Sequence, residues 1–482
     1  MFLLFCLKWL KQDVSDILPE PTVAPASKLE LEINSILNQI NQKFPKTTVK
    51  IKEKSTSAKN SKVFLRNPKS SYCVGDHLTV QVQMFDYNGS KKTYGGDYLR
   101  ARMFTSELGA AASGRIEDFQ NGTYHVHFIL FWEGNVTISI FIMHPSEASS
   151  ALWRFRNQWH GYVDHLGKFT RQQEVQEVVC GFELNKTQEL CEYGDQRDEE
   201  YFYCVKPNNF DCDSLTDMKS CDFYFNFVCL STICINIFAY QKHILKQILF
   251  VILFLIDVTE VKEKCTLGMK LEYPSGYVMK NVWYPKACSM MKYDSLEELG
   301  TCLQWKFIYL FGDSTLRQWI MYFKNHISAL AQFYLYDDNW SHQLLNLDLK
   351  RNMKISWKRH TYPFITSSYQ SWKEERTITR EIDLIRGDHR TVIILNIGVH
   401  FRAYPTYYFI KRLLNIRRAI ERLFLRSPQT KVIIKTENTG EMNKNFETMS
   451  DFHASVHYSI MEIVFTNLNV GFCQWMGYDQ CI

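Results

Sequence analysis

The sequence predicts a protein of two unlike parts, an all-β domain of immunoglobulin size followed by an α/β domain with a mostly parallel sheet. With 482 residues, the chain is longer than one ordinary domain. From about Lys62 onward, polar and apolar residues alternate over short segments, which indicates half-buried strands. Beyond about Lys306 the pattern changes to short apolar runs separated by helical patterns, which is typical of a parallel sheet covered by helices.

Composition narrows the functional class. Hydrophobic residues make up 46% and charged residues 22% of the chain, as in ordinary folded domains. The formal charge of +5 is small for this length, and no Lys/Arg stripe with interleaved aromatic residues is found, so we expect no nucleic-acid partner. One basic cluster lies on a helical pattern and is interpreted as a solvated helix face. Its members are Lys411, Arg412, Arg417, Arg418 and Arg422.

Cysteines and glycosylation sequons indicate the compartment. The chain has 14 cysteines but no C-x-x-C pair, which argues against a zinc ribbon. The N-x-S/T sequons lie at Asn88, Asn121, Asn135, Asn185 and Asn339. Together these features favour secretion or the lumen of the Golgi and secretory pathway, where disulfides and glycans form.

Residues 1–61 are interpreted as a signal or anchor remnant followed by a stem. Met1–Leu10 is apolar except for Lys8, but it lacks a basic leader and a small-residue cleavage site. Membrane anchorage through the N-terminus therefore stays open. A helical pattern over Leu29–Ile40 precedes a Lys/Ser/Thr-rich stretch, which is typical of a linker.

Residues 62–220 are predicted to form the β-sandwich and a cysteine-rich connector. His77–Met84 alternates strictly, and Tyr87–Ser90 carries a turn sequence. Thr123–Phe131 and Asn135–Met143 read as two strands, and the Trp-Glu-Gly-Asn sequence between them predicts a hairpin. Short strands at this spacing indicate an immunoglobulin-like sandwich.

This part contains two histidines that could bind a metal ion and four cysteines that could form disulfides. His125 and His127 share one strand face, but no third ligand is near them in the sequence, so we interpret them as surface residues and predict no metal. Residues 145–220 read as a loop-rich connector stapled by disulfides, whose pairing stays open. The cysteines are Cys180, Cys191, Cys204 and Cys212.

Residues 221–261 form an atypical apolar insert. The apolar stretch from Cys229 to Ile256 is interrupted by polar residues, and only Ile248–Ile256 is uninterrupted. That run is much shorter than the ~20 residues that a membrane helix needs. A marginal membrane span and a structural irregularity are both left open.

Residues 262–482 are predicted to form the α/β domain. Phe307–Phe311, Thr391–Leu395 and Lys431–Lys435 are short apolar runs of the kind that lie buried in the middle of a parallel sheet. Thr406–Leu425 has apolar residues at helical spacing and follows Pro405, a residue suited to a helix start.

The most specific chemical signal follows the first of these strands. In an open α/β sheet, ligands bind beyond the carboxyl ends of the strands. Ser314 stands there at a strand-to-helix turn, where the helix N-terminus favours a developing oxyanion. Gly312 permits the turn and Asp313 can cap the helix. Ser314 is thus a candidate nucleophile, and a simple helix cap is the alternative.

The other strand ends supply candidate partners. Asn396 and Gly398 can complete an oxyanion hole. A serine nucleophile needs a base, and the candidates are His400, His453 and His457. Packing is an equally good explanation for His400. His453 stands with Asp451 in the first turn of a helix that we expect to run to about residue 465.

Several motifs in order resemble the neurexophilin and PC-esterase domain (NXPE) family. They are Glu200–Val205, Gly312–Trp319, Gly398–Arg402, Leu425–Pro428 and Lys435–Asn438. The resemblance covers most of residues 60–220 and 262–471. It implies a neurexophilin-like immunoglobulin-type domain followed by an SGNH-like (GDS esterase-type, PC-esterase) domain.

The resemblance also implies an activity. Ser314 would carry an acyl group, with Asp313 and Arg317 in the same motif as further site residues. Family members are implied to act in the secretory pathway on a glycan acceptor, with O-acetylation, sialic acid included, as the reaction. An acetyl donor such as acetyl-CoA follows from this, whereas no bound cofactor is expected.

This chain departs from the family pattern near its end. Relatives are expected to supply the catalytic Asp and His after the strand near Gly471, but here Asp479 is followed by no histidine. Without a base, serine chemistry loses orders of magnitude in rate, so we expect catalysis to be impaired. The alternative is a secreted neurexophilin-like glycoprotein that binds a cell-surface partner without catalysis.

Overall fold

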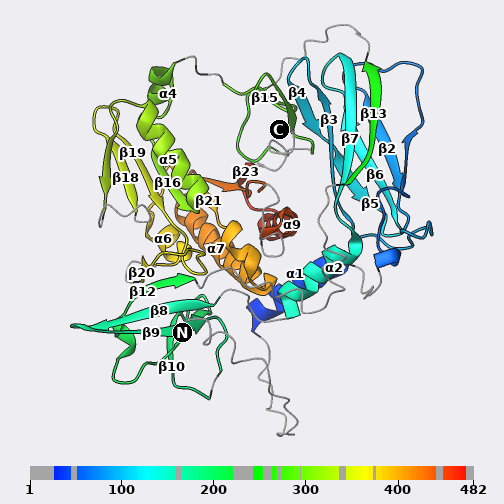
Figure 1. Ribbon diagram of the computed structural model, residues 1–482. Coiled ribbons are helices and arrows are strands. Elements are labelled where there is room, and N and C mark those ends of the chain that lie inside the picture. The colour runs from blue at the N-terminus through cyan, green and yellow to red at the C-terminus, as the bar shows by residue number, and fades with distance from the viewer. Residues whose placement is uncertain are drawn as a thin grey trace.

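The computed structural model has three parts, a β-sandwich, a smaller connecting sheet and an α/β unit (Figure 1). The structure describes residues 27–44, 52–158, 164–185, 187–220, 243–252, 263–269, 273–291, 293, 295–335, 343–372, 376–440 and 449–473. The N-terminal segment Met1–Leu10, the sequon at Asn339 and the acid Asp479 therefore lie outside the described residues.

Two antiparallel sheets form the sandwich, which confirms the all-β prediction. One has the order β1-β2-β6-β5 and the other the order β13-β7-β3-β4-β14-β15. Alternate residues such as Val80, Val126 and Ile138 are fully buried between the sheets, as the period of a half-buried strand requires. The strands are β1 (Lys62–Arg66), β2 (His77–Gln83), β3 (Tyr98–Thr105), β4 (Ala110–Ser113), β5 (Arg115–Asp118), β6 (Thr123–Ile129), β7 (Gly134–His144), β13 (His243–Ile252), β14 (Gly276–Met279) and β15 (Val282–Pro285).

The hairpin predicted between β6 and β7 is wrong, because these strands lie in different sheets. The segment between them crosses the edge of the sandwich, with Trp132 only 4% exposed in the core. The indole Nε1 of Trp132 donates to Thr105 Oγ1 at 2.8 Å, which anchors the crossing. Alternation shows which side chains are buried but not which sheet a strand joins, so the sequence pattern fits both arrangements.

The apolar insert contributes one strand whose backbone is described. β13 pairs antiparallel with β7 at the edge of its sheet, whereas residues 221–242 and 253–262 lie outside the described residues. Across the ranges that the structure describes, no helix is long and apolar enough to cross a membrane.

The connector is a sheet rather than the loop-rich segment expected. After the helix α2 (Ser146–Gln158), the strands pair in the order β10-β11-β9-β8-β12-β20. Disulfides join Cys180 to Cys204 and Cys191 to Cys212, and a third joins Cys265 to Cys288. The strands are β8 (His165–Arg171), β9 (Glu174–Gly181), β10 (Leu190–Asp195), β11 (Glu200–Val205), β12 (Leu215–Ser220) and β20 (Gln370–Ser371), and a short 3-10 helix η2 spans Cys212–Ser214.

A seven-stranded mixed sheet forms the α/β unit, in the order β17-β18-β19-β16-β21-β22-β23. The five neighbouring strands β19, β16, β21, β22 and β23 are parallel, which agrees with the prediction for the three buried runs. β17 and β18 pair antiparallel at the other edge. The strands are β16 (Phe307–Gly312), β17 (Ala331–Tyr334), β18 (Leu344–Asp348), β19 (Met353–Lys358), β21 (Thr391–Asn396), β22 (Lys431–Lys435) and β23 (Gly471–Cys473).

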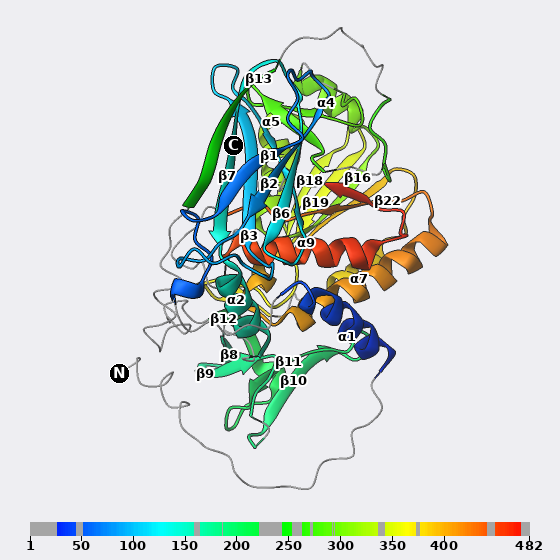
Figure 2. The same cartoon turned by 90° about the vertical axis from the view of Figure 1, so that its right-hand side faces the viewer.

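Helices cover both faces of this sheet. α5 packs on the face that carries Ile308 and Leu310, whereas α7 and α9 pack on the face that carries Ile393 and Leu395. Figure 2 shows α9, α7 and α1 together beneath the strands. The helices are α1 (Lys28–Asn41), α4 (Leu296–Cys302), α5 (Ser314–His326), α6 (Ile378–Leu384), α7 (Thr406–Arg426) and α9 (Asp451–Phe465), with 3-10 helices η1 (Lys52–Lys54) and η3 (Val399–Ala403).

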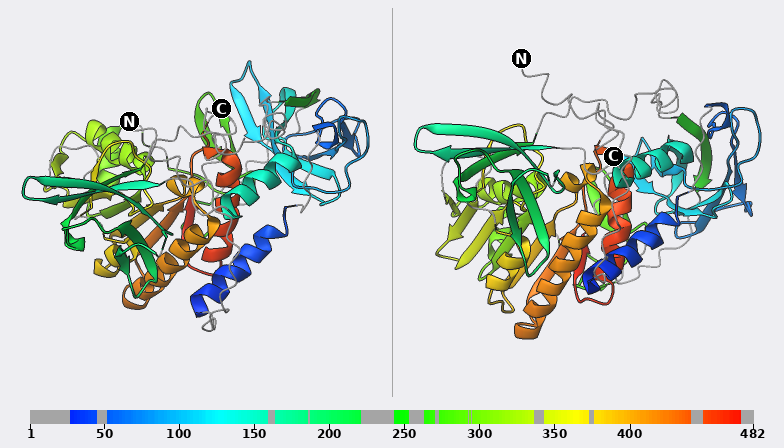
Figure 3. Two further views of the ribbon diagram at one scale, coloured as in Figure 1. Left: turned by 60° about the horizontal axis from the view of Figure 1, so that its bottom comes forward. Right: turned by 90° about the horizontal axis from the view of Figure 1, so that it is seen from below.

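α1 belongs to the core of the α/β unit rather than to a stem. Its apolar face, with Ile33 and Ile40 at 0% and 1% exposed, joins the same cluster as α7 and α9. The two views in Figure 3 show α1 beside these helices. Burial of one helix face gives a better account of the apolar periodicity at Leu29–Ile40 than a linker does, because an exposed linker gains nothing from it.

Candidate active site

Ser314 is the first residue of α5, directly beyond the carboxyl end of β16. Gly312 lies against the end of β21, where a Cβ would come 2.2 Å from the carbonyl oxygen of Asn396, so the turn requires glycine. Ser314 is exposed, and within the described ranges its hydroxyl has no hydrogen-bond partner. The turn thus presents a free hydroxyl at the positive end of a helix dipole.

Asp313 holds this turn in place. Its Oδ1 accepts hydrogen bonds from the N–H and the hydroxyl of Thr315 at 2.7 and 2.6 Å. The carboxyl is 1% exposed, and burial raises the pKa of Asp313. Arg317 follows one turn later, half-buried, with its N–H donating to the Asp313 carbonyl at 3.3 Å. Asp313 therefore positions Ser314 and is the helix cap that the sequence predicted.

Asn396 and Gly398 lie at the same edge of the sheet, at the end of β21. The Asn396 side chain is 1% exposed and its Nδ2 donates to the carbonyl of Thr436 at 3.1 Å. A Cβ on Gly398 would lie 1.8 Å from Oε1 of Glu437. Both residues therefore contact the segment that follows β22. Their part in an oxyanion hole stays a prediction.

His400 lies in η3 and packs rather than contacting Ser314. Its ring stacks on Phe364 with centroids 4.5 Å apart, and its Nδ1 accepts the N–H of Ile365 at 3.1 Å. Burial lowers the pKa of His400 to about 4, so the imidazole is neutral. Of the two roles that the sequence left open for His400, the described contacts are those of packing.

The other candidate bases, His453 and His457, are 1% and 0% exposed and take part in a buried polar network. Nδ1 of His457 lies 2.5 Å from Oε1 of Glu437. The second carboxylate oxygen of Glu437 accepts from Nε of Arg402, also at 2.5 Å. Burial opposes ionisation of Glu437, but Arg402 and His457 outweigh it and lower the pKa of Glu437 to about 2.

Arg156 completes the network from the N-terminal half of the chain. It comes from α2 and lies 2.5 Å from Nε2 of His457 and 3.3 Å from Nδ1 of His453. A neutral His457 with its proton on Nδ1 fits both neighbours, because it donates to Glu437 and accepts from Arg156. No local motif pointed to Arg156, whereas Glu437 lies in the Lys435–Asn438 motif that follows a predicted strand.

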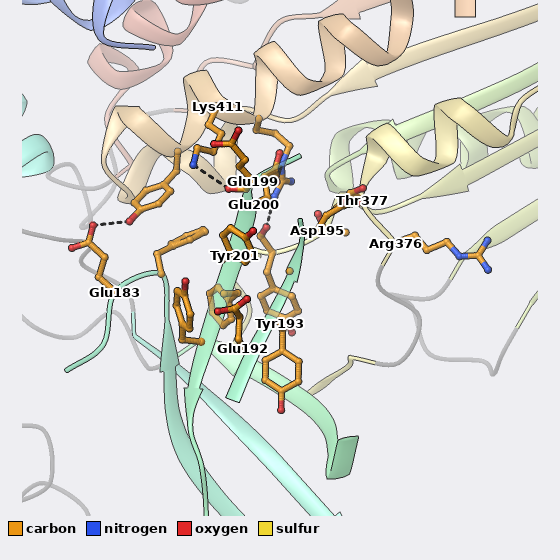
Figure 4. A pocket seen from close by; sticks show the side chains of 18 of the residues that line it. Glu183, Glu192, Tyr193, Asp195, Glu199, Glu200, Tyr201, Arg376, Thr377 and Lys411 are labelled. Carbon is orange, nitrogen blue, oxygen red and sulfur yellow. Dashed lines mark hydrogen bonds and ion pairs between the residues drawn. The ribbon is translucent and has the colours of Figure 1, made fainter. Parts of the chain in front are cut away.

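An open pocket of about 740 Å³ lies between β10, β11 and the start of α7 (Figure 4). The catalytic residues predicted from the sequence do not line it, although Phe401, which follows His400, does. Aromatic rings dominate one wall, and Arg376 at its mouth has no ion-pair partner within the described residues. Six of the aromatic residues are Tyr193, Tyr201, Tyr203, Trp372, Tyr407 and Tyr408.

The basic cluster on α7 is not the solvated face that the sequence suggested. Arg412 is 4% exposed and donates to Glu200 at 2.5 Å and to the Tyr362 carbonyl at 2.7 Å. The other contacts are Lys411 with the Glu199 carbonyl, Arg417 with Glu421, Arg418 with Glu32 and Arg422 with Asp383. The charges bind α7 to the connector, α1 and α6.

Four of the predicted glycosylation sequons lie within the described residues. Their asparagines, Asn88, Asn121, Asn135 and Asn185, are all exposed, as a glycan requires. The three disulfides are compatible with a secreted or lumenal protein, since such bonds persist in oxidising compartments.

Comparisons with known proteins give two family-model matches and one solved structure of low similarity. One solved structure, described as "Crystal structure of the Lin-41 filamin domain", matches at 19% identity and a TM-score of 0.16 over 18% of this chain and 82% of that one. The family model described as "Neurexophilin" matches residues 31–242, and that described as "NXPE family member 4-like, C-terminal domain" matches residues 283–477. These two matches, which together span most of the chain, show that it belongs to the NXPE family.

Proposed function

We propose that this protein transfers an acetyl group to or from a glycan hydroxyl in the secretory pathway, through an ester on Ser314. The exposed hydroxyl of Ser314 at the start of α5, which has no partner among the residues that the structure describes, carries the proposal. In the first step Oγ attacks the carbonyl carbon of the donor, the bond to the donor's leaving group breaks, and the serine proton passes through solvent to that leaving group. In the second step the glycan hydroxyl attacks the acetyl-serine and regenerates Ser314.

Electrostatics at the turn support this chemistry. The tetrahedral intermediate carries a negative charge, which the N-terminus of α5 favours through its N–H groups and dipole. Within the described ranges no imidazole or carboxylate is hydrogen-bonded to Ser314. None of the described side chains is therefore assigned as the base of Ser314. The proposal includes an SGNH-like fold for the α/β unit.

We propose that the pocket beside α7, which none of the predicted catalytic residues lines, binds a part of the glycan at a distance from the hydroxyl that reacts at Ser314. Its volume of about 740 Å³ suits a small-molecule site. Aromatic rings can stack on the apolar faces of a sugar ring, while the tyrosine hydroxyls meet its hydroxyl groups. In Figure 4 the exposed side chain of Arg376 extends away from the aromatic residues, so it would have to turn toward a bound carboxylate, which a guanidinium binds in a bidentate manner. An acidic sugar, sialic acid among them, fits this combination.

Acetyl trapping tests the catalytic proposal. The full-length protein, secreted from cultured cells, is incubated with p-nitrophenyl acetate and digested for peptide mass spectrometry. We expect one acetyl group on the peptide that contains Ser314 and none there in Ser314→Ala. Ser295→Ala is the matched control, because Ser295 is an exposed serine at the N-terminus of α4 that caps its helix in the ordinary way. Equal acetyl incorporation and equal ester hydrolysis in Ser314→Ala would refute the mechanism.

A second candidate function is binding of a cell-surface partner without catalysis. The neurexophilin match over residues 31–242 favours it, together with Phe64 and Phe119, which are 46% and 44% exposed on the sandwich. The test is saturable binding of the full-length Ser314→Ala protein to cells. Loss of binding in Phe64→Ser and Phe119→Ser supports this function. If the protein that keeps both phenylalanines shows no saturable binding, this function is rejected.

A further inference from the structure

The outer face of the four-stranded sheet brings together two histidines and a glutamate. In β6, Tyr124, Val126 and Phe128 are fully buried in the sandwich, so His125 and His127 point to the opposite face. The neighbouring strand β5 pairs with β6 and places a carboxylate, that of Glu117, opposite His125. The sequence analysis found no third ligand because this residue is a neighbour only through strand pairing.

We propose that Glu117, His125 and His127 bind a divalent transition-metal ion of the zinc type. Their potential ligand atoms all lie within 4.8 Å of one another. Nε2 of His127 and Oε2 of Glu117 are 3.0 Å apart, now joined by a hydrogen bond. A tetrahedral ion with bonds of about 2.0–2.1 Å holds its ligand atoms roughly 3.3 Å apart, so the ion can replace the shared proton with little movement.

The surroundings of His127 suit a metal ligand. Thr79 on the adjoining strand β2 places its Oγ1 3.1 Å from Nδ1 of His127. When Nε2 binds an ion, Nδ1 keeps its proton and donates it to this hydroxyl, which orients the ring. On the other histidine, Phe119 packs edge-on against His125 with centroids 4.4 Å apart and limits the rotation of that ring.

Arg66 is the internal competitor for the site. Its Nη1 lies 3.1 Å from Nε2 and 3.3 Å from Nδ1 of His125, and its charge opposes a cation. Arg66 is exposed, so its side chain can swing into solvent at small cost.

Three protein ligands leave a coordination position open. Such a set, two histidines and one carboxylate, is common in zinc sites whose fourth ligand is water or an incoming group. The ligand class is therefore Zn²⁺, with Co²⁺ as its spectroscopic substitute. This inference is independent of the acetyl-transfer proposal, because the ligands belong to the sandwich and Ser314 to the α/β unit.

Titration of the full-length protein tests the site. The free thiols, those of Cys73, Cys302 and Cys473 among them, are first alkylated, and metal is removed with EDTA. ZnCl₂ is then added in a calorimeter and CoCl₂ in a spectrophotometer. We expect one equivalent of Zn²⁺ to bind and a Co²⁺ visible spectrum without thiolate charge-transfer bands.

Variants locate the bound ion. We expect His127→Ala and Glu117→Gln each to weaken Zn²⁺ binding at least tenfold, and Arg66→Gln to strengthen it because the competing charge is gone. His77→Ala is the control, since His77 is an exposed histidine at the start of β2, outside the cluster. Circular dichroism checks the fold of each variant, and Arg66→Gln, which removes no ligand, serves if another variant unfolds. Unchanged Zn²⁺ affinity in Arg66→Gln together with binding that survives in His127→Ala would overturn the proposal.

Discussion

Arg156 and His457, which are 301 residues apart in the sequence, are hydrogen-bonded at 2.5 Å in the interior. Arg156 also donates to the carbonyl groups of Phe401 at 2.9 Å and Tyr404 at 2.6 Å. These carbonyls belong to the segment that follows β21 at the candidate site. Arg156 belongs to α2, the helix that follows β7. It thus holds in place the edge of the α/β sheet at which the site residues lie.

Removal of this arginine should destabilise the protein strongly. We expect Arg156→Met to lower the free energy of unfolding by about 3–5 kcal/mol, because it leaves His453, His457 and two buried carbonyls with fewer partners. Urea denaturation measures the change. Arg171→Met is the control, since Arg171 pairs with Glu174 on the surface and should contribute less than about 1 kcal/mol. If Arg156→Met lowers the free energy of unfolding no more than Arg171→Met does, Arg156 does not hold the sheet edge in place.

Gly398 should tolerate no side chain. In Gly398→Ala, the new methyl group would meet Oε1 of Glu437, whose position is held by Arg402 and His457. We expect a loss of about 2 kcal/mol or more in unfolding free energy and weaker acetyl labelling of Ser314. Gly181→Ala is the matched control, because its Cβ would meet only Leu184 at an ordinary 3.6 Å. Equal stability of the two variants contradicts this prediction.

Stability should fall as the solution becomes acidic, in two windows. Burial holds the pKa of His457 and of His144 at about 4, below the ordinary 6.5, so the unfolded chain takes up protons first. The free energy of unfolding should then decrease as pH falls from 6.5 to about 4. The contribution of ionised Glu437 is present above pH 4.5 and is lost as pH falls from 4.5 toward its folded pKa of about 2.

His144 is one of the contributors to the first window, together with His457 and His400. Its Nε2 lies 2.7 Å from Oγ of Ser450, the cap of α9, and burial alone lowers its pKa. We expect His144→Gln to flatten the decrease in unfolding free energy between pH 6.5 and 4, because the amide does not titrate. Thermal unfolding across this range measures the slope. An unaltered slope in His144→Gln contradicts the assignment.

The connector should depend on its disulfides. Cys191 and Cys212 close a segment with a sequence separation of 21, so Cys191→Ser with Cys212→Ser should cost about 3 kcal/mol of stability. Non-reducing thermal denaturation measures the change, with Cys302→Ser as control because Cys302 is free and exposed. A double variant as stable as the control shows that the connector sheet holds without this bond.

The pocket assignment, which depends on the proposed function, predicts a role for Arg376. We expect Arg376→Ala to weaken binding of N-acetylneuraminic acid by about tenfold without loss of stability, because the guanidinium is exposed and has no ion-pair partner among the described residues. Saturation-transfer NMR of the full-length protein measures the binding. Arg171→Ala, a charge removed elsewhere on the surface, is the control. Unchanged binding in Arg376→Ala removes Arg376 from the site.

The sequence by itself determined what depends on local pattern. Alternation over β2, the apolar runs of β16, β21 and β22, and the helical spacing of α7 appear in the structure where they were predicted. The position of Ser314 at a strand-to-helix turn also followed from its neighbours, because a strand end, a glycine and a capping aspartate are local features.

Only the tertiary structure decided which distant residues meet. The sheet that β7 joins, the cysteine pairs, the packing of α1, the carboxylate of Glu117 beside His127 and the contact of Arg156 with His457 all join segments that no local pattern relates. The physical reason is that the spacing of apolar residues shows which side of a helix or strand is buried, but not which other element packs against that side. Buried charges such as Arg156 and Glu437 take their roles from the neighbours that compensate them, and those neighbours are set by the fold as a whole.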